Sequence, residues 1–254
     1  MAALDKTARK PVDRTIDSAE IERFARMAEE WWDPDGKFRP LHRLGPVRIG
    51  YIRDRLCARF KRDAAGERPL AGLRLLDIGC GGGLTCEPLA RLGARVTAID
   101  AGERNIEVAR THAAGQGLAI DYRFAAAADV VAAGERFDAV LSLEVVEHVA
   151  DRRAFLADCC SLVAPGGVLL LATLNRTAKS FLLGIVAAEY VLRWLPAGTH
   201  DWNRFVRPSE LAADLRASGF RLDDLTGITY NPLSDRFSLS QDVDVNYLAV
   251  AARP

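Results

Sequence analysis

Three residues near the middle of the chain have the side-chain types and the spacing of a catalytic or metal-binding group. Glu144, Glu147 and His148 follow the apolar run 137–143, and positions i, i+3 and i+4 lie on one side of a helical turn. His148, together with Glu144, could act as a general base. The three side chains could instead hold a divalent cation such as Mg²⁺ or Mn²⁺, which would lower the pKa of a bound hydroxyl. A third interpretation is that the carboxylates solvate the turn and His148 packs against a neighbour.

A glycine-rich loop, 79–83, is the strongest single indication of a ligand site. It follows the apolar segment 73–77 and precedes a predicted helix, where the backbone must approach a ligand closely and glycine avoids a Cβ clash. Asp100 ends the next predicted strand, where a carboxylate can accept hydrogen bonds from both hydroxyls of a ribose. Gly79, Gly81 and Asp100 are therefore predicted to bind a cofactor.

Three neighbouring residues refine the prediction of the ligand. Leu84 stands where the dinucleotide fingerprint GxGxxG requires glycine. The remaining GxGxG pattern favours S-adenosylmethionine, which has no pyrophosphate for a helix N-terminus to bind, over a nicotinamide dinucleotide. Leu143 would lie over the adenosine side of the cleft, or belong to the ordinary core. Asp77 could meet a methionyl ammonium group, or cap the loop by accepting backbone N–H groups.

The elements that must position these residues alternate between short apolar strands and helices. Strands are predicted over 73–77, 95–100, 120–124, 137–143 and 168–173, and again over 221–229 and 243–251. Alternation of this kind predicts an α/β fold, with a parallel sheet covered by helices on both faces. The last two strands would add an antiparallel pair and give a Rossmann-like sheet of seven strands.

The rest of the chain divides into an extension and an insertion. Residues 1–70 are predicted to form an N-terminal helical extension, with helices over 21–32 and 46–60. Residues 71–254 form the predicted cofactor-binding domain. The segment 175–205 interrupts the alternation and is predicted to be a helical insertion.

Composition narrows the class of protein and of partner. The 254 residues carry 34 Lys and Arg against 34 Asp and Glu, without a dense basic block, so no nucleic-acid partner is expected. Five cysteines without a CxxC pair predict reduced thiols in a cytoplasmic protein. We expect no secretory signal, and no run reaches the roughly 20 apolar residues of a spanning helix.

The chain resembles the ubiquinone-biosynthesis O-methyltransferase family of class I S-adenosylmethionine-dependent methyltransferases, from about Phe24 to Tyr247. The glycine loop is common to many methyltransferases, whereas other segments are more particular and occur in the family's order. These are Trp31-Trp32-Asp33, Pro40-Leu41-His42-Arg43, Arg48-Ile49-Gly50-Tyr51-Ile52, Glu144-Val145-Val146-Glu147-His148-Val149, Thr173-Leu174-Asn175-Arg176-Thr177, Ala188-Glu189-Tyr190, Pro196-Ala197-Gly198-Thr199-His200-Asp201, Tyr230-Asn231-Pro232 and Asp242-Val243-Asp244-Val245-Asn246-Tyr247.

The resemblance implies methylation of phenolic hydroxyls on a polyprenylated ring, at two steps of ubiquinone assembly. It also implies that Arg48, Gly79, Asp100 and Leu143 contact S-adenosylmethionine, and it admits contacts with other enzymes of the pathway. Methionine is frequent in the family at the position of Leu143. The run 125–128 consists of alanines where the family is more acidic, which leaves Asp129 as the nearby candidate for the adenine amino group.

Two alternatives to this function stay open. The first is a methyltransferase of the same fold that acts on another small molecule, and the second is a non-catalytic scaffold subunit that binds S-adenosylmethionine. His42 and His200, in irregular segments, are candidates to line an acceptor site.

The segment Phe181 to Leu195 has two interpretations. Its charged residues are Glu189 and Arg193, and it is either a buried helix over the sheet or a lid whose apolar face contacts the membrane surface and admits a prenyl tail. In the second case Arg176, Lys179 and Arg193 would face anionic lipid head groups, and the protein would lie peripherally on the inner face of the membrane.

Overall fold

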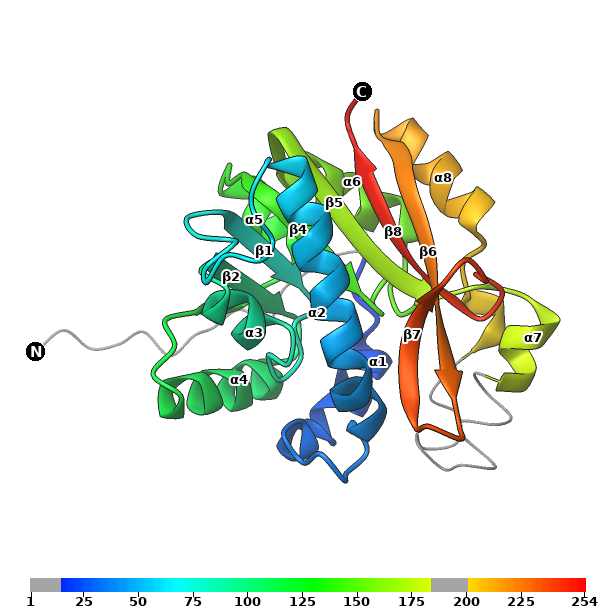
Figure 1. Ribbon diagram of the computed structural model, residues 1–254, viewed down its shortest axis with the longest axis horizontal. Coiled ribbons are helices and arrows are strands. Elements are labelled where there is room, and N and C mark those ends of the chain that lie inside the picture. The colour runs from blue at the N-terminus through cyan, green and yellow to red at the C-terminus, as the bar shows by residue number, and fades with distance from the viewer. Residues whose placement is uncertain (1–14, 184–200) are drawn as a thin grey trace, which may run out of the picture.

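A single mixed sheet organises the protein in the computed structural model, which describes residues 15–183 and 201–254 (Figure 1). The eight strands occur in the order β3-β2-β1-β4-β5-β8-β6-β7. Their bounds are Arg74–Ile78 (β1), Arg95–Asp100 (β2), Asp121–Phe124 (β3), Phe137–Leu143 (β4), Val163–Leu174 (β5), Arg221–Asn231 (β6), Arg236–Ser240 (β7) and Asn246–Ala252 (β8).

The sheet confirms the predicted α/β class and adds one strand to it. Strands β1 to β5 pair in parallel, and β8 pairs antiparallel with both β5 and β6. The additional strand, β7, pairs with β6 as an edge hairpin, within a segment that we expected to be rich in turns. The carboxyl ends of the parallel strands therefore meet at one edge, where open α/β sheets bind ligands.

Helices cover both faces of the sheet, as predicted. One face is packed by α2, α3 and α4, whose apolar residues join one core cluster with inward-facing strand residues. The other face is packed by α5, α6 and α8 in a second cluster. The bounds of these helices are Arg39–Arg59 (α2), Cys86–Arg91 (α3), Glu103–Gly115 (α4), Ala127–Ala132 (α5), Arg152–Leu162 (α6) and Pro208–Ala217 (α8). Because successive strand residues point to opposite faces, neighbours such as Leu75 and Leu76 enter different clusters.

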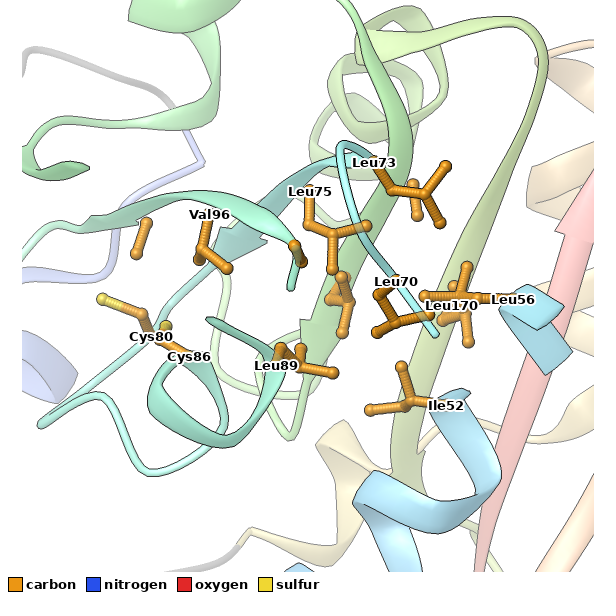
Figure 2. Packing of buried hydrophobic residues seen from close by; sticks show 14 of the residues in the cluster. Ile52, Leu56, Leu70, Leu73, Leu75, Cys80, Cys86, Leu89, Val96 and Leu170 are labelled. Atoms are coloured by element: carbon orange, nitrogen blue, oxygen red, sulfur yellow. The ribbon is translucent and has the colours of Figure 1, made fainter. Parts of the chain in front are cut away.

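The predicted N-terminal extension is part of the same core. Ile52 and Leu56 of α2 are fully buried, and they belong to one hydrophobic cluster with Leu70, Leu75 and Leu170 (Figure 2). We expected a division of the chain near residue 70, but α2 shares one hydrophobic cluster with β1 and β5. The boundary near residue 70 therefore stays a prediction from the sequence, because the hydrophobic packing continues across it.

Helix α2 begins earlier than the sequence predicted. We expected it to start at Pro46, whereas it starts at Arg39, with Pro40 in its first turn, and contains Pro46. A proline in the first turn loses no helical hydrogen bond, but an interior proline does. Leu44 and Arg48, both buried on either side of Pro46, show that packing on the sheet outweighs that loss.

The predicted helix over 21–32 is two shorter elements, α1 (Ser18–Ala25) and a 3-10 turn over Ala28–Glu30. Within the predicted insertion, α7 covers Ala178–Ser180 and a second 3-10 turn covers Trp202–Arg204. Most of the segment Phe181 to Leu195, with Glu189 and Arg193, lies outside the described residues, as does His200.

All five cysteines are buried, and none of them forms a disulfide. In the described ranges, no helix has the length and apolar character to cross a membrane.

Candidate active site

The glycine loop joins β1 to α3 with a backbone that favours glycine. Gly79, Gly81 and Gly83 have φ values of 74°, 53° and 89°, a region that side-chain-bearing residues rarely adopt. A Cβ atom on Gly79 would overlap Val145, and one on Gly81 would overlap the ring of Trp31. Glycine is therefore required both for the turn and for close packing on either side of it.

Asp100 lies at the end of β2 and organises the backbone around the loop. Its Oδ2 accepts a hydrogen bond from Gly81 N at 2.9 Å, and its Oδ1 accepts from Gly102 N at 2.7 Å. Burial raises the pKa of Asp100, while these backbone donors and Asn105 favour its charged form. A carboxylate has about four lone-pair sites, so Asp100 retains the capacity to accept hydrogen bonds from a ribose. Gly79, Gly81 and Asp100 are brought together as predicted.

Two tryptophans of the N-terminal extension close over the loop, and no role was predicted for them. Trp31 stacks on Phe38 with ring centroids 3.7 Å apart, and its Nε1 donates to Asn105 Oδ1 at 3.0 Å. Asn105 Nδ2 donates in turn to Asp100 Oδ1 at 3.1 Å. Trp32 Nε1 donates to Gly82 O at 2.9 Å. The extension is thus tied by side chains to the loop and to Asp100.

The stacking partner of Trp32 is a histidine of α4. The ring of His112 stacks on Trp32 with centroids 3.5 Å apart. Its Nδ1 lies 2.6 Å from the buried carboxylate of Glu87. His112 therefore supports the extension where it meets the loop. His42 contacts the other tryptophan of the pair, since its Nε2 lies 2.9 Å from Trp31 O.

Asp77 and Arg48 are buried charged side chains in the wall of the cavity beside the loop. Burial raises the pKa of Asp77 to about 6, opposed by the Cys86 thiol, which donates to Oδ2 at 3.1 Å, and by the charge of Arg48. We had considered backbone N–H groups as donors to the Asp77 carboxylate, whereas the donor to its Oδ2 is the Cys86 thiol. Nε of Arg48 is buried and, within the described part of the chain, has no hydrogen-bond partner.

Leu143 and the alanine run also line this cavity, whereas Asp129 does not. Leu143, at the end of β4, is partly buried, and Ala125 to Ala127 lie beside it in the cavity wall. Asp129 Oδ2 accepts a hydrogen bond from Ala126 N at 2.8 Å and thereby caps α5. The predicted adenine contact of Asp129 is therefore unsupported, because its side chain is used at a helix end.

Glu144 has a backbone conformation that is unusual for its residue type. It directly follows β4 with a φ of 56°, and such strain is tolerated where the surroundings fix it, often at functional sites. Its Oε1 accepts a hydrogen bond from Arg48 Nη2 at 2.9 Å. Glu144 is thereby held beside Arg48, with its side chain about a quarter exposed.

Glu147 points into the protein interior and away from the cavity. It is 3% exposed, and its Oε2 accepts a hydrogen bond from Thr173 Oγ1 at 2.8 Å. Burial raises the pKa of Glu147 well above its ordinary value, and the neighbouring Glu144 raises it further. Both effects favour the protonated form of Glu147.

His148 turns toward the N-terminal extension. Its Nδ1 lies 2.7 Å from Glu20 Oε2, and its ring packs edge-on against Phe24 with centroids 5.4 Å apart. Glu144 thus bonds Arg48, Glu147 bonds Thr173 and interacts with Glu144, and His148 bonds Glu20. Over residues 15–183 and 201–254, no three His, Cys, Asp or Glu side chains are grouped to hold a metal ion. The predicted metal site does not fit this arrangement, and a divalent cation stays a prediction from the sequence.

One cavity of about 930 Å³ connects these features. Its lining includes the glycine loop, Asp100, Asn105, Arg48, Glu144 and His148. This volume lies at the upper end of the range for small-molecule sites, so the cavity has room for two reactants.

Fold and site together define a protein of the methyltransferase class. A family model described as "Methyltransferase domain" matches residues 49–225. Curated relatives narrow the class further. The chain is 58% identical over 240 residues to "Ubiquinone biosynthesis O-methyltransferase" of Sinorhizobium medicae, covering 94% of this chain and 97% of the relative. It is 56% identical over 249 residues to the protein of the same name from Parvibaculum lavamentivorans, covering 98% and 97%. The chain belongs to the ubiquinone biosynthesis O-methyltransferase family.

Solved structures share the fold at low sequence identity. Magnesium protoporphyrin IX methyltransferase from Synechocystis PCC 6803, solved with bound SAH, is 20% identical with a TM-score of 0.64, over 92% of this chain and 95% of that one. The plantazolicin methyltransferase BpumL is 16% identical with a TM-score of 0.63, over 92% and 96%. The predicted Rossmann-like methyltransferase fold is confirmed.

Proposed function

We propose that the chain transfers the methyl group of S-adenosylmethionine to a phenolic hydroxyl of a polyprenylated ring during ubiquinone biosynthesis. The observation that carries this proposal is the single cavity that runs from the glycine loop and Asp100 to His148. Methyl transfer requires two reactants to be aligned in one water-poor space, and a nucleoside site that opens onto a candidate base provides such a space. The names of the closely similar relatives support the choice of pathway.

S-adenosylmethionine fits the charged groups of the cavity. Asp100 suits the ribose hydroxyls, and Asp77 suits the methionyl ammonium group. Nε of Arg48, which has no hydrogen-bond partner among the described residues, suits the carboxylate. When bound, this cofactor supplies a methyl carbon that is activated by a sulfonium. The residues of the chain have to bind and orient it, exclude water and take a proton from the acceptor.

The apolar lining of the cavity suits a phenol with a prenyl chain. Ile21, Phe24, Leu41 and Phe237 contribute apolar walls, which favour a prenyl chain over a charged acceptor. A phenol with a pKa near 10 is largely protonated at neutral pH, so its oxygen needs a base. We propose His148 for that role, with Glu144 holding Arg48 at the cofactor.

The test is methyl transfer from labelled S-adenosylmethionine to a short-chain prenylated catechol, with EDTA or with added Mg²⁺. We expect product in both cases, because the described side chains do not group around a metal ion. Product that disappears with EDTA and returns with Mg²⁺ would instead establish the metal requirement predicted from the sequence. Absence of product, despite measurable cofactor binding, would contradict the proposed acceptor.

Peripheral contact with anionic lipid is a finer part of the proposal. Arg176 pairs with Glu210, and Lys179 pairs with Asp242 and Asp244, so these two charges are already partnered inside the protein. The contact with lipid is supported instead by exposed apolar side chains. Phe181, Leu182 and Leu183 are 45%, 58% and 51% exposed. Co-sedimentation with phosphatidylglycerol vesicles, compared between the native chain and Leu182→Asp, tests the contact. Contacts with other enzymes of the pathway stay a prediction from the resemblance.

A further inference from the structure

Two consecutive hydrogen bonds connect the N-terminal extension to the carboxylate of Asp100. Trp31 Nε1 donates to Asn105 Oδ1 at 3.0 Å, and Asn105 Nδ2 donates to Asp100 Oδ1 at 3.1 Å. Trp31 and Asn105 are 8% and 3% exposed, so water competes little for either bond. All three side chains line the cavity. The bonds therefore join a residue of the extension, through the first turn of α4, to the carboxylate proposed to bind a ribose.

The chemistry of the indole fixes the orientation of the Asn105 amide. An indole N–H donates hydrogen bonds and accepts none, so it faces the oxygen of an amide and not its nitrogen. With Oδ1 turned to Trp31, Nδ2 is turned to Asp100. A rotation of the amide by half a turn would place Oδ1 against the carboxylate and Nδ2 against the indole N–H, and both contacts would be repulsive. Trp31 thus determines which end of Asn105 meets Asp100.

The donors around Asp100 leave one acceptor site open on its carboxylate. Oδ1 accepts from Gly102 N and from Asn105 Nδ2, and Oδ2 accepts from Gly81 N. A carboxylate has about four lone-pair sites, two on each oxygen. Among the described residues, these three bonds use both sites on Oδ1 and one on Oδ2. The site that stays open for a ligand is therefore on Oδ2.

Asn105 acts on both the orientation and the charge of this carboxylate. Its amide is a third donor, which restricts the rotation that the two backbone donors leave to the group. Burial raises the pKa of Asp100, and the donors on Gly102, Asn105 and Gly81 oppose that rise. A charged carboxylate accepts stronger hydrogen bonds than a neutral one does. Loss of the Asn105 donor would therefore make Asp100 both less ordered and a weaker acceptor.

We propose that Asn105 is a positioning residue, which is oriented by Trp31 and holds Asp100 so that Oδ2 accepts a ribose hydroxyl of S-adenosylmethionine. This inference rests on the proposed function, since it concerns binding of the methyl donor. Because Trp31 belongs to the extension, the extension has to be docked for the ribose site to be complete.

A purely structural role for Asn105 would have a different signature. If Asn105 only fastens Trp31 to α4, its loss would weaken every ligand of the site by one common factor. If it positions Asp100, its loss would mainly weaken ligands that carry the hydroxyl bound by Oδ2. Trp32 provides the comparison, because its Nε1 donates to Gly82 O at 2.9 Å and so fastens the extension without passing through Asn105.

The experiment measures Kd by isothermal titration calorimetry for S-adenosylhomocysteine and for its 2′-deoxy and 3′-deoxy analogues, with the full chain. Asn105→Leu nearly retains the volume of the side chain and removes its donor and acceptor. We expect it to weaken binding of S-adenosylhomocysteine about tenfold. For the deoxy analogue that lacks the hydroxyl bound by Oδ2, we expect a change of about twofold or less.

Two further variants complete the comparison. Trp31→Phe retains a ring on Phe38 but no longer orients the amide of Asn105, so it should reproduce the ligand dependence with a smaller loss. Trp32→Phe is the matched control, and it should change the three Kd values by one common factor. If Asn105→Leu does not fold, as circular dichroism would show, Trp31→Phe provides the same test.

The outcomes separate this inference from the proposed function. Equal weakening of all three ligands by Asn105→Leu would show that Asn105 only fastens the extension, and the inference would be wrong. Unchanged affinity for S-adenosylhomocysteine in that variant would overturn it as well. If the native chain does not bind S-adenosylhomocysteine, the proposed function fails, and the inference fails with it.

Discussion

At the scale of single residues, the site is built from charges whose ionisation depends on their neighbours. Asp77 and Glu147 are both buried carboxyl groups, but they have different surroundings. Burial raises the pKa of Asp77 to about 6, and the positive charge of Arg48 limits this rise. Burial also raises the pKa of Glu147, and there the neighbouring Glu144 raises it further. The neighbouring charge thus favours the ionised form of Asp77 and the neutral form of Glu147.

The affinity for S-adenosylmethionine is expected to rise between pH 5 and pH 7. Asp77 is neutral below its pKa of about 6 and charged above it, and the charged form attracts the methionyl ammonium group, which stays protonated in this range. Below the pKa the ionised fraction falls by about tenfold per pH unit. Isothermal titration at several pH values measures the slope, and Asp77→Asn should flatten it.

Asp129→Asn serves as the control, because Asp129 is an exposed carboxylate that caps α5 outside the cavity. An affinity slope that persists in Asp77→Asn would show that another group is responsible.

The raised pKa of Asp77 also has a consequence for folding stability. Between pH 3.8 and about 6 the folded chain binds the Asp77 proton more tightly than the unfolded chain does, so this group's contribution to stability falls as pH rises through that window.

At the scale of elements, sequence patterns predicted what is local and missed what is long-range. The parallel strands appear as short apolar runs because both faces of the sheet are covered. The edge strand β7 has one neighbour and mostly exposed residues, Leu239 being 46% exposed, so it carries little apolar signal. Gly79 and Asp100 end consecutive strands, and local spacing suffices to find them. The bonds of His148 with Glu20 and of Trp31 with Asn105 span 128 and 74 residues, which no spacing rule relates.

The packing of the extension on the glycine loop leads to a prediction about two glycines. A Cβ atom on Gly82 would overlap Trp31, whereas one on Gly50, inside α2, meets nothing within 4 Å. Gly82→Ala should therefore lower the free energy of unfolding by about 1–3 kcal/mol. Gly50→Ala should raise it by about 0.5–1 kcal/mol, because alanine favours the helix. Urea denaturation of both variants measures the difference, and a Gly82→Ala variant as stable as the native chain would contradict the described contact.

At the scale of the whole molecule, the cavity is lined by parts of the chain that are far apart in sequence. The carboxyl edge of the parallel sheet supplies Asp100 and His148, and the extension supplies Glu20, Trp31 and Trp32. In Figure 1 the extension, in blue, lies beside the ends of the central strands, and α2 continues from it across the sheet. We therefore expect a ligand in the cavity to contact both parts and to bind more tightly when the extension is docked.

Binding of S-adenosylhomocysteine should consequently protect the extension from trypsin. Arg26 and Lys37 are exposed cleavage sites on either side of the tryptophan pair, and cleavage requires local release of the backbone. A ligand that binds only the docked form reduces the released population by the factor 1 + [L]/Kd, about 100-fold at a hundred times Kd. Trp31→Phe retains a ring on Phe38 but loses the donor to Asn105, so protection at the same ligand concentration should be weaker. If cleavage at Arg26 proceeds at one rate with and without the ligand, the extension does not close over the cofactor site, and the link through Trp31 and Asn105 to Asp100 has no part in binding.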